Sequence, residues 1–237
     1  MIIRKLVAHH LKHRDDLGFY RIQARDAVQW LQRSGVVLDR TTTALDLGAG
    51  SGLLGTELMK LGCHVTFADE TNWLPPDIPS ACFHQINIER DDLSTLGRYD
   101  LLICSNVMEH LADPDRLIVA SGSVLKPGGR FYLSWTNWLS PWGGHDFSPF
   151  HYLGPRLGPW AFQKVLGRPA RSKPFENLWP TYVGRTLRTI RRQPDLCILR
   201  MAPRYYTEFA FLMRLPVLRE FLAWNCAVLI GKKPQRP

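Results

Sequence analysis

With 237 residues, 45% of them hydrophobic and 22% charged, the chain has the size and composition of one soluble domain with a large core. Charged residues interrupt both the apolar start of the chain and the apolar stretch 209–231, so we expect neither a signal peptide nor a membrane-spanning helix of about 20 apolar residues. The formal net charge of +9 is concentrated in residues 137–193, which fits a solvated face, an anionic substrate, a membrane surface or nucleic acid.

The five cysteines form no C-x-x-C pair and no grouping with histidine of the kind that binds a metal. Several lie in apolar runs, where a free cysteine packs as a small hydrophobic residue. We therefore expect reduced thiols, a cytoplasmic location and no metal site.

Residues 1–40 are predicted to form a helical cap. Asp15 and Asp16 suit a helix N-terminus, and Ser34-Gly35 suits a helix end. Between them, one face of the helix carries the apolar residues Ile22, Ala27, Val28, Trp30 and Leu31.

The stretch Thr43–Leu54 organises the rest of the chain. Residues 44–47 predict a short buried strand, residues 48–52 (GAGSG) a tight turn, and the apolar pattern from Leu53 a helix, which is the first half of a βαβ unit. Leu53 stands where a dinucleotide fingerprint needs its last glycine, and no G-K-[ST] follows, so neither of those phosphate sites fits. The free N–H groups of such a turn face a ligand, or the turn holds no ligand at all.

Residues 64–70 predict the second strand, with two acids at its carboxyl end. An acid at this corner of a nucleoside-binding fold accepts hydrogen bonds from the ribose hydroxyls. Asp69 fits the spacing from the turn best and Glu70 competes with it, while two ordinary surface acids are the alternative. Three prolines make the next connection irregular, and Cys82–Ile88 predicts the third strand.

Residues 99–107 are a nearly continuous apolar run, as expected for a central parallel strand covered on both faces. Asp113-Pro114 opens the next helix, because proline suits the first helical position. Residues 126–129 (KPGG) predict a type II turn, and residues 131–135 predict the fifth strand.

Three of these segments, in order, resemble motifs of the class I S-adenosylmethionine (SAM)-dependent methyltransferases. They are D-x-G-x-G-x-G at 46–52, YDLLICSNVMEHL at 99–111, which looks like motif IV of the type 11 subgroup, and LKPGGRFYLSW at 125–135. The resemblance implies a Rossmann-like α/β fold: a seven-stranded, mostly parallel sheet with an antiparallel last strand and helices on both faces. It also implies SAM as the cofactor.

The resemblance assigns further residues to the cofactor. They are Asp46, Gly48, Ala49, Gly50 and Gly52 in the turn, Asn87 and Ile88 near the adenine, and Ser105 and Asn106 after the fourth strand. The adenine position is often Asp in the family, and this chain has Asn87 or Glu89 there. Because the N-terminal helix closes over SAM in the family, Tyr20 and Arg21 could also reach it, unless this helix only packs.

The second half of the chain is less generic. Residues 136–154 are rich in proline, glycine and aromatic rings, so we predict an aromatic and basic loop insertion over 137–180 at the carboxyl edge of the sheet. We then expect a helix over 181–192, a sixth strand over 195–201, a helical insertion over 206–222 and an antiparallel strand over 225–231, all within a single domain 1–237. The aromatic loop and residues 203–225 resemble a set of actinobacterial methyltransferase-like proteins of poorly defined substrate.

Methyl transfer from a sulfonium needs a general base only when the acceptor is a hydroxyl, a protonated amine or an acidic carbon. His110, after the fourth strand, and His145, on the aromatic loop, are the candidate bases, with His151 as an alternative. Asp146 could orient His145, and His110 and Glu109 could instead only fix the helix start by hydrogen bonding. Four rings could surround the acceptor or the sulfonium, or only pack the loop: Trp135, Trp138, Trp142 and Tyr152.

We therefore expect a SAM-dependent methyltransferase that methylates O or C of a small, apolar or lipid-like acceptor. No [ND]-P-P-[YF] motif follows the fourth strand, which argues against planar amino groups as acceptors. The alternatives are an RNA methyltransferase that uses the basic segment 156–192 and a non-catalytic SAM-binding or assembly protein, although no nucleic-acid docking module is evident. Residues 206–224 could contact a membrane surface peripherally, and the sequence leaves the oligomeric state open.

Overall fold

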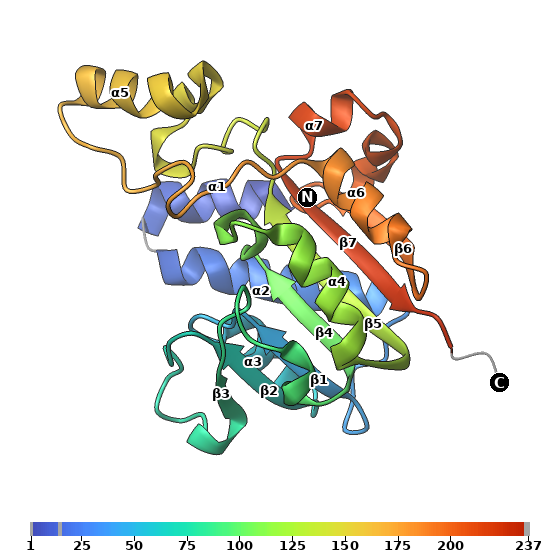
Figure 1. Cartoon of the computed structure of the whole chain (residues 1–237). Helices are drawn as coiled ribbons and strands as arrows, with labels where there is room; N and C mark the ends of the chain where they lie inside the picture. The colour runs from blue at the N-terminus through green and yellow to red at the C-terminus, as the bar shows by residue number, and fades with distance from the viewer. Residues whose placement is uncertain (1, 14–15, 235–237) are drawn as a thin grey trace.

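The sheet of this protein has seven strands in the order β3-β2-β1-β4-β5-β7-β6. A computed structural model describes residues 2–13 and 16–234 (Figure 1). The five strands from β3 to β5 run parallel, and β7 is antiparallel to both of its neighbours, β5 and β6. This is the predicted Rossmann-like α/β fold.

The strands are β1 (Thr43–Leu47), β2 (His64–Asp69), β3 (Phe83–Gln85), β4 (Tyr99–Ser105), β5 (Leu125–Thr136), β6 (Leu196–Pro203) and β7 (Asn225–Lys232). The α-helices are α1 (Ile2–His13), α2 (Asp16–Arg33), α3 (Leu53–Met59), α4 (Pro114–Val124), α5 (Gly154–Leu166), α6 (Val183–Arg192) and α7 (Leu218–Leu222). The described residues also form six 3-10 helices: η1 (Ser80–Cys82), η2 (Leu93–Leu96), η3 (Met108–His110), η4 (His145–Phe147), η5 (Phe150–Leu153) and η6 (Thr207–Arg214).

Helices cover both faces of the sheet (Figure 1), and as a result most residues of β1 and β4 are buried. On one face, Leu117 of α4 and Leu187 of α6 join the core cluster formed with β4 and β5. On the other face, Leu31 of α2 and Leu58 of α3 join a second cluster. The near-continuous apolar pattern of β4 follows from this covering on both sides.

Several element boundaries differ from the sequence-based expectation. The third strand is only Phe83–Gln85, because a 3-10 turn takes up residues 80–82 before it. The fifth strand begins before the KPGG turn rather than after it: Leu125 pairs with Tyr99, and pairing resumes at Arg130 with Leu101. The turn is therefore a bulge within β5, and Gly128 at its bend has a φ of +79°.

The insertion after β5 contains a helix that the sequence does not predict. Proline and glycine at the start of α5 suggest a loop, yet Pro155 stands in the first turn, where a missing N–H costs no hydrogen bond. In Figure 1 this helix projects from the body of the molecule, beyond the carboxyl ends of the parallel strands. Within the described part of the chain, no helix is both long enough and apolar enough to cross a membrane.

Candidate functional site

The glycine turn after β1 lies against the end of β2. The N–H groups of Gly48 and Ala49 both donate to the Ala68 carbonyl, at 2.8 and 3.2 Å. Gly48 has a φ of +71°, and an added Cβ would stand 2.3 Å from Val107, so glycine is required there. At Gly50, with a φ of +50°, an added Cβ would meet no atom within 4 Å. This side of the turn is therefore open.

Asp69 ends β2 at the rim of the open turn. Its Oδ2 accepts a hydrogen bond of 2.8 Å from Gly50 N. The neighbouring Glu70 accepts a hydrogen bond from the Asn87 amide, which brings two further predicted residues to the same corner. Ile88 is buried in the core and supports this corner from below.

Asp46 lies beneath the turn rather than at its rim. Its Oδ2 accepts a 2.8 Å hydrogen bond from Gly55 N, which fixes the first turn of α3. Burial raises the pKa of Asp46 to about 7, the hydrogen bond from Gly55 opposes that rise, and the charge of Asp69 adds to it. The direct contact of Asp46 with the cofactor stays a prediction.

The end of β4 is held by a buried arginine from the far end of the chain. Arg204 is 3% exposed, and its guanidinium donates to Ser105 Oγ at 3.1 Å and to Asn106 Oδ1 at 3.3 Å. Asn106 in turn donates to Gln23 Oε1 on α2 at 3.3 Å. The helix α2 therefore covers this edge of the sheet. Tyr20, on the same helix, is about half exposed, and its role in cofactor binding stays a prediction.

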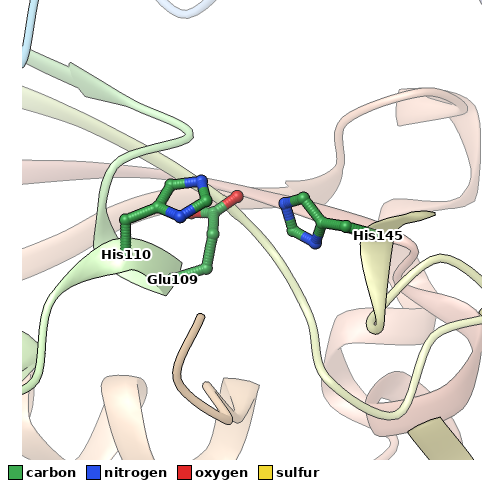
Figure 2. A group of neighbouring side chains, drawn as sticks. All are labelled: Glu109, His110 and His145. Atoms are coloured by element: carbon green, nitrogen blue, oxygen red, sulfur yellow. The ribbon is translucent and has the colours of Figure 1, made fainter. Parts of the chain in front are cut away.

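Two of the predicted histidines meet beyond the end of β4 (Figure 2). The rings of His110, in η3, and His145, in η4, lie edge to face with centroids 5.4 Å apart. Glu109 joins them, and one ligand atom of each of the three residues lies within 4.8 Å of the other two. His145 is held with a φ of +51° and Asn106 with a φ of +57°, and such uncommon backbone conformations are typical of functional sites.

The other candidate residues of the aromatic loop make mainly structural contacts. The Asp146 carboxylate does not orient His145: it accepts hydrogen bonds of 2.8 Å from the backbone N–H groups of Arg171 and Ser172. His151 is buried, and its Nε2 bonds the Ser140 carbonyl at 3.0 Å, so it serves the packing of the loop. Trp135 and Trp138 are also buried, whereas Trp142 and Tyr152 are exposed and can meet a ligand.

Comparison with known proteins places this geometry in a family. Residues 19–168 match the family model of a methyltransferase domain. The chain belongs to this methyltransferase family. An uncharacterised methyltransferase of Mycobacteroides abscessus is 32% identical over 232 residues, 90% of this chain and 86% of that protein. One of Mycolicibacterium gilvum is 29% identical over 239 residues, 96% of this chain and 92% of that protein.

Solved structures agree with the fold of the methyltransferase. A SAM-dependent methyltransferase of Mesorhizobium loti has a TM-score of 0.60 at 18% identity, covering 87% of this chain and 98% of that one. The magnesium protoporphyrin IX methyltransferase of Synechocystis, solved with bound SAH, has a TM-score of 0.54 at 15% identity, covering 90% of this chain and 84% of that one. These likenesses concern the fold.

SAM is the cofactor of the methyltransferase, and the residues present fit it. The open side of Gly50 leaves space where a side chain would otherwise stand. Asp69 and Glu70 provide acceptors at the rim for ribose hydroxyls, and the Asn87 amide lies beside them. Gly48, Ala49 and Gly52 shape the backbone around this space, so the turn would hold the methionine part.

Sequence reasoning missed two residues of the site. The sequence pattern relates Glu109 only to the motif after the fourth strand and to a helix start, whereas its carboxylate lies between the two histidines. Arg204 gave no sequence signal, because its contact with β4 depends on how β6 ends. Because β7 is antiparallel to both β5 and β6, β6 runs in the same direction as the parallel strands. Only this strand arrangement could have indicated that Arg204, which follows β6, lies at their carboxyl edge.

Proposed function

We propose that this methyltransferase transfers the methyl group of SAM to an oxygen of a small apolar or lipid-like acceptor that it takes from a membrane surface; an acidic carbon is the alternative acceptor atom. The observation that carries the proposal is the surface of α5 and the residue before it. Leu157 and Trp160 are 62% and 59% exposed there, and three further apolar residues lie exposed along the same segment: Leu153, Val165 and Leu166. A soluble helix rarely presents so many apolar side chains to water without a partner.

The charge around this helix favours an anionic lipid surface as that partner. Arg156 and Lys164 are exposed on α5, and the helix contains no acidic residue. Long basic side chains beside apolar rings suit the boundary between lipid headgroups and acyl chains. Further apolar residues are exposed on η6, on α7 and at the residue before α7: Phe209, Phe211, Phe221 and Val217.

The same helix is tied to the reactive end of the sheet. Phe162 of α5 packs in one cluster with Phe147 of η4, the short helix that also carries His145. Asp146 then anchors the segment that follows α5 through Arg171 and Ser172. An acceptor that leaves a membrane at α5 would therefore reach the histidine cluster over a short path.

Methyl transfer requires few catalytic groups from the protein, because the cofactor carries the activated methyl group. When bound, SAM supplies an activated methyl group on a sulfonium. A lone pair of the acceptor oxygen forms the new bond to the methyl carbon as the carbon–sulfur bond breaks, and the electron pair of the broken bond stays on sulfur. The acceptor proton passes by way of the cluster of Glu109, His110 and His145 to water. The protein orients the two partners and excludes bulk water.

Incubation with labelled SAM and a total lipid extract tests the proposal. We expect a lipid-soluble product that is one methyl group heavier than its precursor, detected by mass spectrometry. Labelling of only water-soluble or RNA species would contradict it. The RNA alternative depends on the basic residues of α6. Neutralising Arg188, Arg191 and Arg192 on that helix should leave lipid labelling unchanged if the acceptor is a lipid.

Vesicle co-sedimentation tests the surface of α5. The double variant Leu157→Glu, Trp160→Glu should lose most of its binding to anionic vesicles, because it places two acids in the apolar face. Val119→Glu is the matched control, since Val119 is equally exposed but lies on α4. Equal binding of both variants would exclude α5 as the docking surface.

A further inference from the structure

Glu109, His110 and His145 form a cluster of two imidazoles and one carboxylate. All three ligand atoms lie within 4.8 Å of one another, and the side chains point toward a common centre (Figure 2). Glu109 and His110 come from η3, directly after β4, while His145 comes from the loop that crosses over it. Two separate segments therefore build the cluster, and folding of the loop completes it.

Hydrogen bonds around the cluster leave lone pairs directed inward. Glu109 is 1% exposed: its Oε1 accepts a 2.9 Å hydrogen bond from Thr136 N, and its Oε2 has no partner among the described residues. His110 Nδ1 donates to the Asn177 carbonyl at 2.7 Å, so the lone pair of that ring is on Nε2. His145 lies opposite them, and one of its ring nitrogens is turned toward the Glu109 carboxylate (Figure 2).

A buried carboxylate oxygen without a donor is costly, since an uncompensated charge loses its hydration. Among the described residues, no lysine or arginine forms an ion pair with Glu109. Arg168 pairs instead with Asp146, the residue that follows His145, at 3.8 Å. A cation at the centre would compensate the Glu109 charge and use the inward lone pairs of both imidazoles.

We propose that Glu109, His110 and His145 bind one divalent transition-metal cation of the Zn²⁺ class, with an open coordination position for the acceptor oxygen. Two imidazole nitrogens and one carboxylate oxygen are a donor set that suits such cations, and three protein ligands leave room for water or substrate. The role toward the acceptor rests on the proposed function, whereas cation binding itself does not.

The surrounding contacts resemble the outer shell of a metal site. The Asn177 carbonyl fixes the ring orientation and tautomer of His110, and Thr136 N fixes the Glu109 carboxylate. Trp179 N also donates to the Glu109 carbonyl at 2.8 Å, which ties the segment 177–179 to η3. These contacts hold two of the ligands in place before a cation arrives.

A cation would change how the acceptor proton leaves. Coordination lowers the pKa of a bound hydroxyl, so the proton passes directly to water and the oxygen keeps the lone pair that forms the new bond to carbon. The two histidines then act as ligands, and neither has to accept the proton. The bond changes of the transfer itself stay the same.

Metal titration of the full chain, without an affinity tag and freed of metal with a chelator, tests the proposal. Co²⁺ should bind once per chain and give visible absorption bands, and Zn²⁺ should displace it. His145→Gln and Glu109→Gln should each weaken binding by about 100-fold or more, because each removes one of three ligands. His84→Gln is the matched control, since His84 is exposed on β3.

Thermal unfolding with and without Zn²⁺ distinguishes the loss of a metal ligand from a general loss of stability in a variant. Excess Zn²⁺ should raise the melting temperature of the wild type and of His84→Gln, but not that of His145→Gln. Metal affinity that is equal in the wild type and in His145→Gln, or no binding in the wild type, would overturn the proposal. SAM affinity of the same chelated protein, measured in parallel, reports on the proposed function separately.

Discussion

Gly50 and Gly35 share a left-handed backbone conformation, with φ of +50° and +79°, and an added Cβ would meet no atom within 4 Å at either one. Gly50→Ala and Gly35→Ala should therefore lose a similar stability, about 1 kcal/mol each, from the strained φ alone. Only Gly50→Ala should also weaken SAM binding, by about 10-fold or more, because its methyl group would enter the space assigned to the cofactor.

Calorimetry with SAM and urea denaturation measure the two effects on both variants. The Gly35→Ala protein corrects for the backbone cost, since Gly35 follows α2 and stands apart from the turn. Equal SAM affinity in the two variants would mean that the open side of Gly50 does not hold the cofactor.

The buried Asp46 predicts a pH dependence of stability. Its pKa is about 7 in the folded protein against an ordinary value of 3.8, so the folded state holds the proton more tightly than the unfolded state. The stability of the SAM-free protein should therefore fall as pH rises from about 4 to 7. Asp46→Asn keeps an acceptor for Gly55 N and removes the ionisation, so it should flatten this dependence and gain about 2–4 kcal/mol at pH 7.

Urea denaturation of both proteins at several pH values checks the Asp46 prediction. A wild-type protein whose stability rises between pH 4 and 7 as steeply as that of Asp46→Asn would contradict it. Carboxylates other than Asp69, whose charge acts on Asp46, contribute equally to both proteins, so the difference between the two curves reports on Asp46 and its coupling to Asp69.

At the scale of the elements, α6 depends on a residue of α7 for its N-terminus. Tyr182 provides no side-chain cap, and Glu220 accepts the N–H groups of Val183 at 3.0 Å and Gly184 at 2.7 Å. Glu220→Ala should therefore cost about 1–2 kcal/mol of unfolding free energy, as the loss of a cap does. Glu176→Ala, which removes only an exposed pair with Lys173, should cost less than about 1 kcal/mol.

Chemical denaturation of both glutamate variants provides the measurement. If Glu220→Ala lost no more stability than Glu176→Ala, the insertion 206–222 would not support α6 as described. Hydrogen exchange at Val183 and Gly184 should also become faster in Glu220→Ala, since both amides lose their acceptor.

The elements that sequence predicts well are those specified by local pattern. The strands β1, β2 and β4 and the glycine turn follow from apolar runs and glycine spacing, and Asp113 caps α4 where Asp-Pro indicated a helix start. The helix α5 was missed because its prolines and glycines favour a loop locally, while packing of Phe162 against Phe150 decides its structure.

The histidine cluster could be predicted only in part. His110 and His145 were named as separate candidates, but their meeting depends on the path of an irregular loop with few periodic signals. The partners of His151 and Asp146 were not readable from sequence for the same reason: Ser140 and Ser172 reach them only after the loop folds. The cofactor corner was easier, since parallel strands bring their carboxyl ends to one edge.

At the scale of the whole molecule, the net charge of +9 predicts that vesicle binding and SAM binding differ in their dependence on salt. Adsorption to anionic vesicles should weaken clearly between 0.1 M and 1 M salt, because the screening length falls from about 10 Å to about 3 Å. SAM affinity should change little over the same range, since the corner assigned to the cofactor would hold it mainly by short-range hydrogen bonds. Co-sedimentation and calorimetry at both salt concentrations measure this pair, and vesicle binding that ignores salt would argue against a role for the basic residues.

Titration of the chain with SAM by calorimetry is the most direct test of the central claim, which is that the corner formed by residues 46–70 binds the cofactor. We expect one SAM per chain with micromolar affinity for the wild type, and affinity at least about 10-fold weaker for Asp69→Ala, which loses the acceptor at the rim. Binding that is absent at millimolar SAM in the folded wild type, or equal in the two proteins, would contradict it.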